Sequence, residues 1–87
     1  MFSGIIEDVG SVEYLNKKKD TIGIKTKFSK FKLGESISCS GVCLTVSKIN
    51  KDMFFTNLSE ETLRKTNLSM LSIGDKINLE KSIKVGQ

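Results

Sequence analysis

Short segments that alternate between polar and apolar residues recur along the chain, and they limit its fold more than any other feature. Thr21 to Thr26 alternates in this way, as does Lys76 to Ile83. Ile5 to Tyr14, Ser36 to Ile49 and Met53 to Leu58 are rich in the β-branched and apolar residues that strands favour. Short strands at this spacing, separated by turns, predict a small antiparallel all-β barrel.

Turn signals separate these segments. They lie at residues 17–20, 33–35, 50–52 and 73–75, and each contains glycine, asparagine or aspartate. Residues 33–37 (LGESI) and 73–77 (IGDKI) share one pattern: an aliphatic residue, glycine, an acid, a polar residue and isoleucine. The pattern predicts one turn-into-strand device used twice, although it is too short to count as an internal repeat.

One segment, Ser59 to Thr66, departs from the strand pattern and predicts a short helix. Ser59 is a suitable N-cap, and Glu60 and Glu61 then fall in the first turn, where negative charge stabilises a helix. The two glutamates are also a candidate acid–base pair. Adjacent helical residues point in different directions, however, so helix-start electrostatics is the alternative explanation.

Length and composition point to one domain, residues 1–87, with a modest hydrophobic core. No apolar run is long enough to span a bilayer, so we expect no membrane partner. The first eight residues have neither a basic region nor a long apolar stretch, and this start is not that of a secretory signal. We therefore expect a cytoplasmic protein.

The net charge of +4 raises nucleic acid as a partner. The lysines are spread along the chain, and Lys17 to Lys19 form the one run, followed by Asp20 between two strand segments. This run is typical of a solvated hairpin tip. Five phenylalanines and one tyrosine are scattered, without tryptophan, and provide no evident stacking platform. We expect no nucleic-acid partner.

The two cysteines, Cys39 and Cys43, flank Gly41, which predicts a β-bulge or a close backbone approach. If both lie on one strand, their Cα atoms are about 13 Å apart at roughly 3.3 Å per residue. A disulfide needs about 4.4–6.8 Å, so we expect two free thiols. The chain contains no histidine, and two thiols are too few for a closed zinc site, so no metal is expected.

The sequence contains few candidate catalytic residues, because a chain without histidine lacks the usual general base near neutral pH. What remains is a set of small polar residues. Strand alternation places Cys43, Thr45 and Ser47 on one face unless Gly41 shifts the register. Such a face suits a polar, planar ligand. An exposed strand face without a ligand has the same composition, and the pattern alone leaves both interpretations open.

Four segments of the chain, residues 1–6, 41–46, 61–68 and 73–80, together resemble the riboflavin synthase family. Residues 1–6 (MFSGII) resemble its MFTGI(I/V) start, and residues 41–46 (GVCLTV) its G-x-C-L-T-V strand. Residues 61–68 (ETLRKTNL) resemble its E-T-L-R-x-T-N-L helix, and residues 73–80 (IGDKINLE) its (V/L)-G-D-x-V-N-L-E strand. The motifs follow the family's order and spacing and cover most of the chain.

The resemblance implies a six-stranded antiparallel Greek-key barrel with one short helix, which binds 6,7-dimethyl-8-ribityllumazine or riboflavin. The family enzyme is a transferase that converts two lumazines to riboflavin and a pyrimidinedione, without a metal or redox cofactor. It contains two such barrels and forms a homotrimer. Its active site lies between the N-terminal barrel of one subunit and the C-terminal barrel of a neighbour.

In the family, the position of Gln87 precedes a G-G-H segment and the second barrel, so the chain resembles the N-terminal half of a two-barrel protein. We expect this half alone to bind ligand, to form a homodimer, and to be nearly inactive. The alternative within the same fold is a non-catalytic, antenna-type lumazine protein.

Site residues carry over from the family by position. The expected ligand-binding residues are Gly4, Ile5, Ile6, Cys43, Leu44, Thr45, Asn57, Leu58, Ser59, Glu60, Glu61 and Thr62. Ile6 and Leu44 are candidates for an apolar slot around the ring, and Thr45, Asn57, Glu61 and Thr62 for partners of the ribityl hydroxyls.

Asn57 departs from the acid that is common in the family. Cys43, Ser36 and Phe2 match positions near the family's reaction centre and are the candidate catalytic residues.

Overall fold

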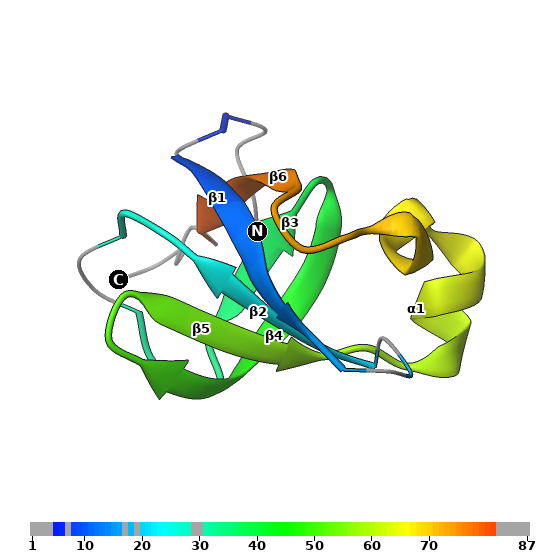
Figure 1. The fold of residues 1–87 in the computed structure, drawn as a ribbon. Helices are drawn as coiled ribbons and strands as arrows, with labels where there is room; N and C mark the ends of the chain where they lie inside the picture. Colours follow the sequence, from blue (N-terminus) through cyan, green and yellow to red (C-terminus); the bar gives the residue numbers. More distant parts are fainter. Residues whose placement is uncertain (1–4, 7, 17, 19, 29–30, 82–87) are drawn as a thin grey trace.

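A computed structural model describes residues 5–6, 8–16, 18, 20–28 and 31–81, whose strands close into a barrel (Figure 1). The strands are β1 (Asp8–Leu15), β2 (Thr21–Lys25), β3 (Ser36–Cys39), β4 (Val42–Asn50), β5 (Met53–Asn57) and β6 (Lys76–Lys81). Their order around the barrel is β1-β2-β5-β4-β3-β6, and every pairing is antiparallel. Strands β3, β4 and β5 are joined by tight turns and β6 returns beside β3, which is a Greek key. The predicted fold class is confirmed.

The short helix α1 (Glu60–Lys65) and the 3₁₀ helix η1 (Asn67–Met70) follow β5 and lie together beyond one end of the barrel (Figure 1). The Ser59 side chain accepts a hydrogen bond of 3.0 Å from the Thr62 N–H, as an N-cap does. The helix ends at Lys65, and Thr66 caps it. The predicted helix and its N-cap are therefore confirmed.

Strand alternation fills the barrel with apolar side chains. The buried hydrophobic residues are Val12, Ile22, Ile24, Ile37, Cys39, Leu44, Val46, Phe54, Leu58, Leu68, Ile77 and Leu79. Every strand contributes to this core, and Leu68 adds the 3₁₀ helix to it. Among the described side chains, the hydroxyl of fully buried Thr56 has no hydrogen-bond partner.

The two matching sequence patterns form the same turn before β3 and before β6. Gly34 and Gly74 have φ angles of 83° and 94°, a region that glycine adopts without a steric penalty. The Gly34 N–H donates to the Val46 carbonyl in β4 at 2.8 Å, and the Gly74 N–H donates to the Val12 carbonyl in β1 at 2.7 Å. Each valine N–H donates back to the acidic residue of the turn at 2.9 Å. The predicted double use of one turn is confirmed.

A break in strand register follows each of these valines. The pairing shifts between Val12 and Tyr14 in β1 and between Val46 and Lys48 in β4, as in a β-bulge. Strand β1 lies between β6 and β2, just as β4 lies between β3 and β5. The barrel therefore has an approximate internal two-fold symmetry, which exchanges β1, β2 and β6 with β4, β5 and β3.

The segment around Gly41 differs from the prediction of a bulge within one long strand. Ser40 and Gly41 have φ angles of 50° and 87° and form a tight turn between β3 and β4, with Cys39 paired to Val42. The two cysteines therefore lie on neighbouring strands. Both thiols are free, as predicted, but the reason differs: the Cys39 side chain faces the core, whereas the Cys43 side chain faces outward.

Candidate ligand site

The outer face of β4 carries the predicted row of small polar side chains. Cys43, Thr45 and Ser47 are exposed, while Leu44 and Val46, which alternate with them, are buried. Strand β3 extends this surface, since Ser36 pairs with Thr45, and Ser38 pairs with Cys43. The prediction that Cys43, Thr45 and Ser47 share a face is therefore confirmed, and Ser36 lies beside it.

The same alternation changes the role of the two leucines among the expected ligand residues. Leu44 and Leu58 are each 5% exposed and belong to the core cluster. A residue between two outward-facing neighbours on a strand must point inward. The Leu44 side chain therefore cannot line a slot on the outer face, and both leucines remain ligand candidates through their backbone groups.

A hollow of about 280 Å³ lies beside the β3–β4 turn. Ile6, Ser38, Ser40, Gly41 and residues 78–80 line it. The Ile5 and Ile6 side chains are 67% and 56% exposed. Ile6 therefore presents apolar surface in the same hollow as Ser38 and Ser40. Of the other expected residues near this point, Phe2 and Gly4 lie outside the described residues.

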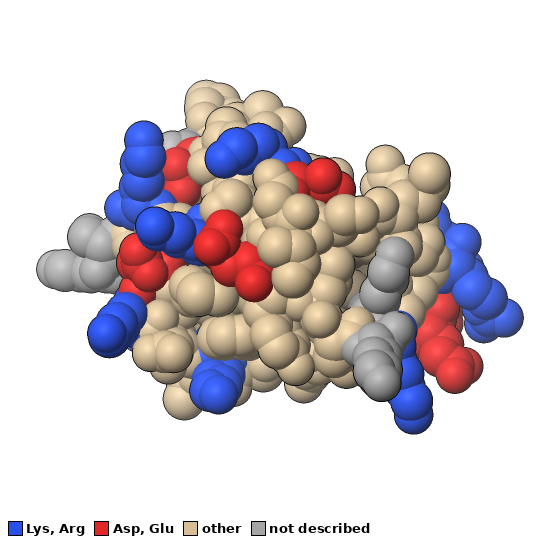
Figure 2. Space-filling model, viewed as in Figure 1, with Lys and Arg blue, Asp and Glu red and all other residues tan. Residues whose placement is uncertain are grey.

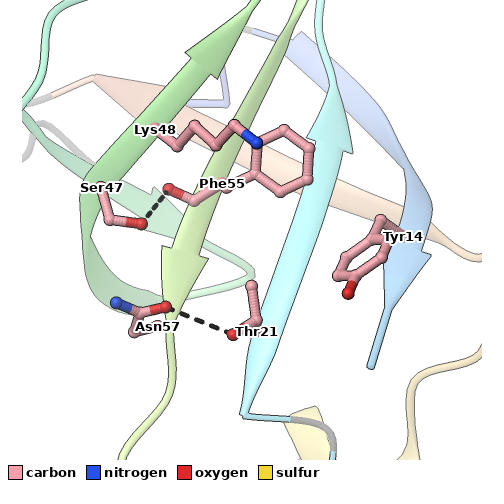
Figure 3. A pocket seen from close by; sticks show the side chains of 6 residues that line it. All are labelled: Tyr14, Thr21, Ser47, Lys48, Phe55 and Asn57. Atoms are coloured by element: carbon pink, nitrogen blue, oxygen red, sulfur yellow. Dashed lines mark hydrogen bonds between the residues drawn. The ribbon is translucent and has the colours of Figure 1, made fainter. Parts of the chain in front are cut away.

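A second hollow, of about 350 Å³, lies at the other end of the β4 face, and Figure 3 shows its lining. Ser47 and Asn57 contribute polar groups: the Ser47 hydroxyl donates to the Phe55 carbonyl at 3.0 Å, and the Thr21 hydroxyl donates to the Asn57 side-chain oxygen at 3.3 Å. Tyr14 and Lys48 stand on either side of Phe55. Asn57 thus connects this hollow to the segment that enters α1.

The aromatic part of this hollow was not predicted from the sequence. The Tyr14 and Phe55 rings meet edge to face with 5.8 Å between centroids, and the Lys48 ammonium lies 5.3 Å from the Phe55 centroid. Gly23 pairs with Phe55, and a Cβ at Gly23 would lie 2.6 Å from the ring. A glycine in an apolar strand is the signal that a large ring lies across it.

The start of α1 holds the remaining expected residues. The Ser59 hydroxyl donates to the Thr62 hydroxyl at 2.9 Å, and Glu61 accepts from the Lys65 ammonium at 2.9 Å on the same helix. Glu60 and Glu61 both lie in the first turn. These local partners fit a capped helix start with acidic residues in its first turn.

The two thiols differ in chemical availability. Burial raises the pKa of the Cys39 thiol to about 12, and the neighbouring Cys43 adds to the shift. Cys43 is exposed on the polar face. Cys43 is therefore the thiol that a ligand on β4 can touch. Within the described ranges, no cluster of three or more histidine, cysteine, aspartate or glutamate side chains is arranged to hold a metal, and no helix there is long and apolar enough to cross a bilayer.

The sequence that forms this closed six-stranded barrel matches a known protein family. Residues 3–82 match the family described as "Lumazine binding domain", and the chain belongs to that family. It is similar to riboflavin synthase of Buchnera aphidicola (subspecies Baizongia pistaciae), with 41% identity over the whole of this chain and 43% of the relative. It is also similar to riboflavin synthase of Bacillus subtilis, with 38% identity over 95% of this chain and 40% of the relative. The chain thus spans less than half the length of these curated relatives.

A solved structure shares the fold. It is the crystal structure of LumP complexed with 6,7-dimethyl-8-(1′-D-ribityl)lumazine, which matches with a TM-score of 0.81 and 27% identity. The match covers 100% of this chain and 51% of LumP. The barrel therefore matches about half of that longer chain.

Proposed function

We propose that this barrel is the N-terminal half of a riboflavin synthase and binds 6,7-dimethyl-8-ribityllumazine or riboflavin on the outer face of β4. The observation that carries the proposal is the exposed row of Cys43 and Thr45, with Ser36 paired beside it, between two hollows. The lumazine bound to a relative that superposes on the whole chain supports it.

The exposed groups suit the two parts of such a ligand. A planar ring needs apolar contact and hydrogen bonds at its edges, and the exposed Ile6 side chain and Thr45 hydroxyl can supply these. A ribityl chain needs several polar partners. Asn57 at the end of β5 and Thr62 in α1 are the groups we assign to it, and Ser59, Glu60 and Glu61 lie between them in sequence.

We further propose that the complete reaction requires a second barrel, because two lumazines must be held face to face. Cys43, Ser36 and Phe2 would lie near the reacting ring. Correct placement of two reactants contributes up to roughly 7–11 kcal/mol to a rate enhancement, and a single ligand site forgoes most of this. The longer protein would be a cytoplasmic homotrimer without a metal or redox cofactor.

An antenna-type lumazine protein is the alternative within this fold. The curated relatives described above are riboflavin synthases at 38–41% identity, whereas LumP is 27% identical. These values favour the synthase. An assay of riboflavin formation from lumazine should show turnover at least about a thousandfold below that of a two-barrel synthase, or ~4 kcal/mol in transition-state stabilisation. Turnover within tenfold would contradict the need for a second barrel.

Fluorescence titration with riboflavin and with the lumazine tests binding. We expect saturable binding, with Thr45→Val weakening it more than Cys43→Ser does. Loss of a hydroxyl partner to a buried ligand costs about 1–3 kcal/mol, while serine replaces cysteine at similar size. No change up to about millimolar ligand, where binding is worth only ~4 kcal/mol, would exclude the proposed function.

We propose that the barrel alone forms a homodimer. Large apolar side chains are exposed on it, and the most exposed include Ile5, Leu33, Met70 and Ile73. Exposed apolar surface favours association, and a second copy of the same barrel gives a closed two-fold interface. Sedimentation at tens of micromolar protein should show a dimer, and a monomer at all concentrations would contradict this proposal.

A further inference from the structure

The internal two-fold symmetry gives the candidate ligand face a counterpart on β1. Strand pairing defines the equivalence, because Val12 and Val46 make the same turn contacts. Counting back from these valines, Thr45 corresponds to Ser11, and Cys43 corresponds to Val9. Ser36, the partner of Thr45, corresponds to Lys76, the partner of Ser11. The loop after β5 corresponds to the loop after β2.

A hollow lies at this counterpart position. It has a volume of about 580 Å³, within the usual range for small-molecule sites. Ser11 and Lys76 form one part of its lining, and Lys25, Lys27 and Phe28 form another. Its lining comes mainly from β1, its neighbour β6, and the end of β2 with the loop that follows it. The two-fold relates these to β4, β3, and the end of β5 with the loop that follows it.

The chemistry of this hollow is cationic. Three of its lining residues, Lys25, Lys27 and Lys76, are lysines, and one, Asp52, is acidic. Asp52 lies 3.9 Å from the Lys25 ammonium, and both side chains are 58% exposed. In Figure 2, basic and acidic side chains are intermixed over the part of the barrel away from α1. The hollow itself keeps an excess of positive charge.

Two further carboxylates contact residues of this lining, and both are already engaged. Glu13 accepts a hydrogen bond of 3.0 Å from the Ser11 hydroxyl. Asp8 accepts hydrogen bonds from the Thr26 hydroxyl at 2.7 Å and from the Lys27 N–H at 2.9 Å. These bonds orient the loop after β2, so the backbone that carries Lys27 and Phe28 is held against β1. Phe28 is half-buried and packs against the core, the Lys81 ammonium lies 5.7 Å from its ring centroid, and the ring also lines the hollow.

We propose that this basic hollow, formed by Ser11, Lys25, Lys27, Phe28 and Lys76, binds a small phosphate ester. The lysine ammonium groups are donors that suit a phosphate dianion. The Phe28 ring offers contact to the organic part of the ester. The site is separate from the lumazine face on β4, and its ligand chemistry differs because Lys76 stands where β3 carries Ser36, and Val9 stands where β4 carries Cys43.

Titration of the protein with inorganic phosphate and with phenyl phosphate, followed by amide shifts in NMR spectra, tests the proposal. We expect saturable shifts at Ser11, Lys25 to Phe28 and Lys76, with phenyl phosphate binding at least threefold more tightly. Added salt should weaken both ligands. Equal affinity for the two probes would overturn the assignment to an ester, and shifts that never saturate would overturn the site.

Charge-matched variants separate this hollow from general attraction to lysine. Lys27→Gln and Lys76→Gln should each weaken phenyl phosphate at least fivefold. Lys48→Gln and Lys65→Gln remove the same charge elsewhere and should change its affinity less than twofold. Equal effects of all four variants would contradict the proposal. Lumazine binding by Lys76→Gln should be unchanged, so failure of this site and failure of the β4 site are distinguishable.

Discussion

The outer faces of β4 and β1 have similar backbones but differ in charge, because the first carries neutral polar side chains and the second is flanked by lysines. In both strands a register break follows a valine. In both, the carbonyl of that valine accepts a hydrogen bond from the glycine of the turn that leads into the neighbouring strand. One face presents Cys43 and Thr45, and the other presents Ser11 beside Lys76. The two faces therefore share one backbone arrangement, and a few outward side chains determine which ligand each face suits.

The largest expected effect concerns the interior under the two faces, where Leu44 corresponds to Gly10. Leu44→Ala should lower the free energy of unfolding by about 3 kcal/mol, because it leaves a cavity in the core. A side chain at Gly10 has no room, since a Cβ there would lie 2.7 Å from Ile24 and 2.8 Å from the Lys25 carbonyl oxygen. Urea unfolding should show that Gly10→Ala also destabilises the barrel. A neutral Gly10→Ala would show that the two interiors adapt more than the geometry indicates.

A smaller effect separates the two faces in ligand binding. Thr45→Val should weaken lumazine by about 1–3 kcal/mol, or roughly fivefold to a hundredfold. Ser11→Val makes the equivalent change on β1 and should leave lumazine affinity within twofold. Calorimetry of both variants is the measurement. A loss of lumazine affinity in Ser11→Val would mean that the ligand binds to the β1 face and not to the β4 face.

Asp8 provides a pH-dependent difference, because its counterpart on β4 is the apolar Val42. Burial of the Asp8 carboxyl opposes its ionisation, but hydrogen bonds from Lys27 and Thr26 outweigh this and lower the pKa of Asp8 below its ordinary value. Its stabilising contribution is therefore present above the unfolded pKa of about 4 and is lost as pH falls through the lower folded pKa.

Asp8→Ala should accordingly cost about 1–2 kcal/mol at pH 7, and the difference from the parent chain should shrink below about pH 4. Urea unfolding at pH 7 and pH 3 checks this. Asp52→Ala is a suitable control, because that carboxylate is more exposed and lies 3.9 Å from its lysine partner. A pH-independent difference for Asp8→Ala would attribute the effect to packing alone.

The smallest expected effect comes from Thr56, whose counterpart in β2 is Ile24. Both are fully buried, but the Thr56 hydroxyl is without a hydrogen-bond partner among the described residues. Thr56→Val should raise stability by about 1 kcal/mol, because it removes an unpaired buried polar group at nearly constant volume. Thermal unfolding of Thr56→Val beside Thr56→Ser is the test, and destabilisation by valine would indicate a polar partner for the hydroxyl.

Local patterns in the sequence were sufficient to predict β1, β2, β5, β6, the helix and the polar face, but they joined β3 and β4 into one strand. Alternation placed Thr45 and Cys43 outward, and the N-cap at Ser59 was evident from its type and the glutamates after it. The break at Gly41 was misassigned, because glycine at a tight turn and glycine at a bulge have the same local signature. Contacts between residues that are distant in sequence were harder to predict. The Tyr14 and Phe55 rings meet across β2, and a sequence does not state which strands are neighbours.

The position of β6 has a consequence for how the barrel assembles. Strands β1–β2, β3–β4 and β4–β5 are hairpins of residues close in sequence, whereas β6 must join β1 from the far end of the chain, where Asp8 pairs with Leu79. Bringing such distant residues together carries the largest loop-closure entropy, and folding rates fall as contacts become less local. We expect the seam between β1 and β6 to form last and to limit the folding rate, so that amides in β6 gain protection from hydrogen exchange after those of the hairpins.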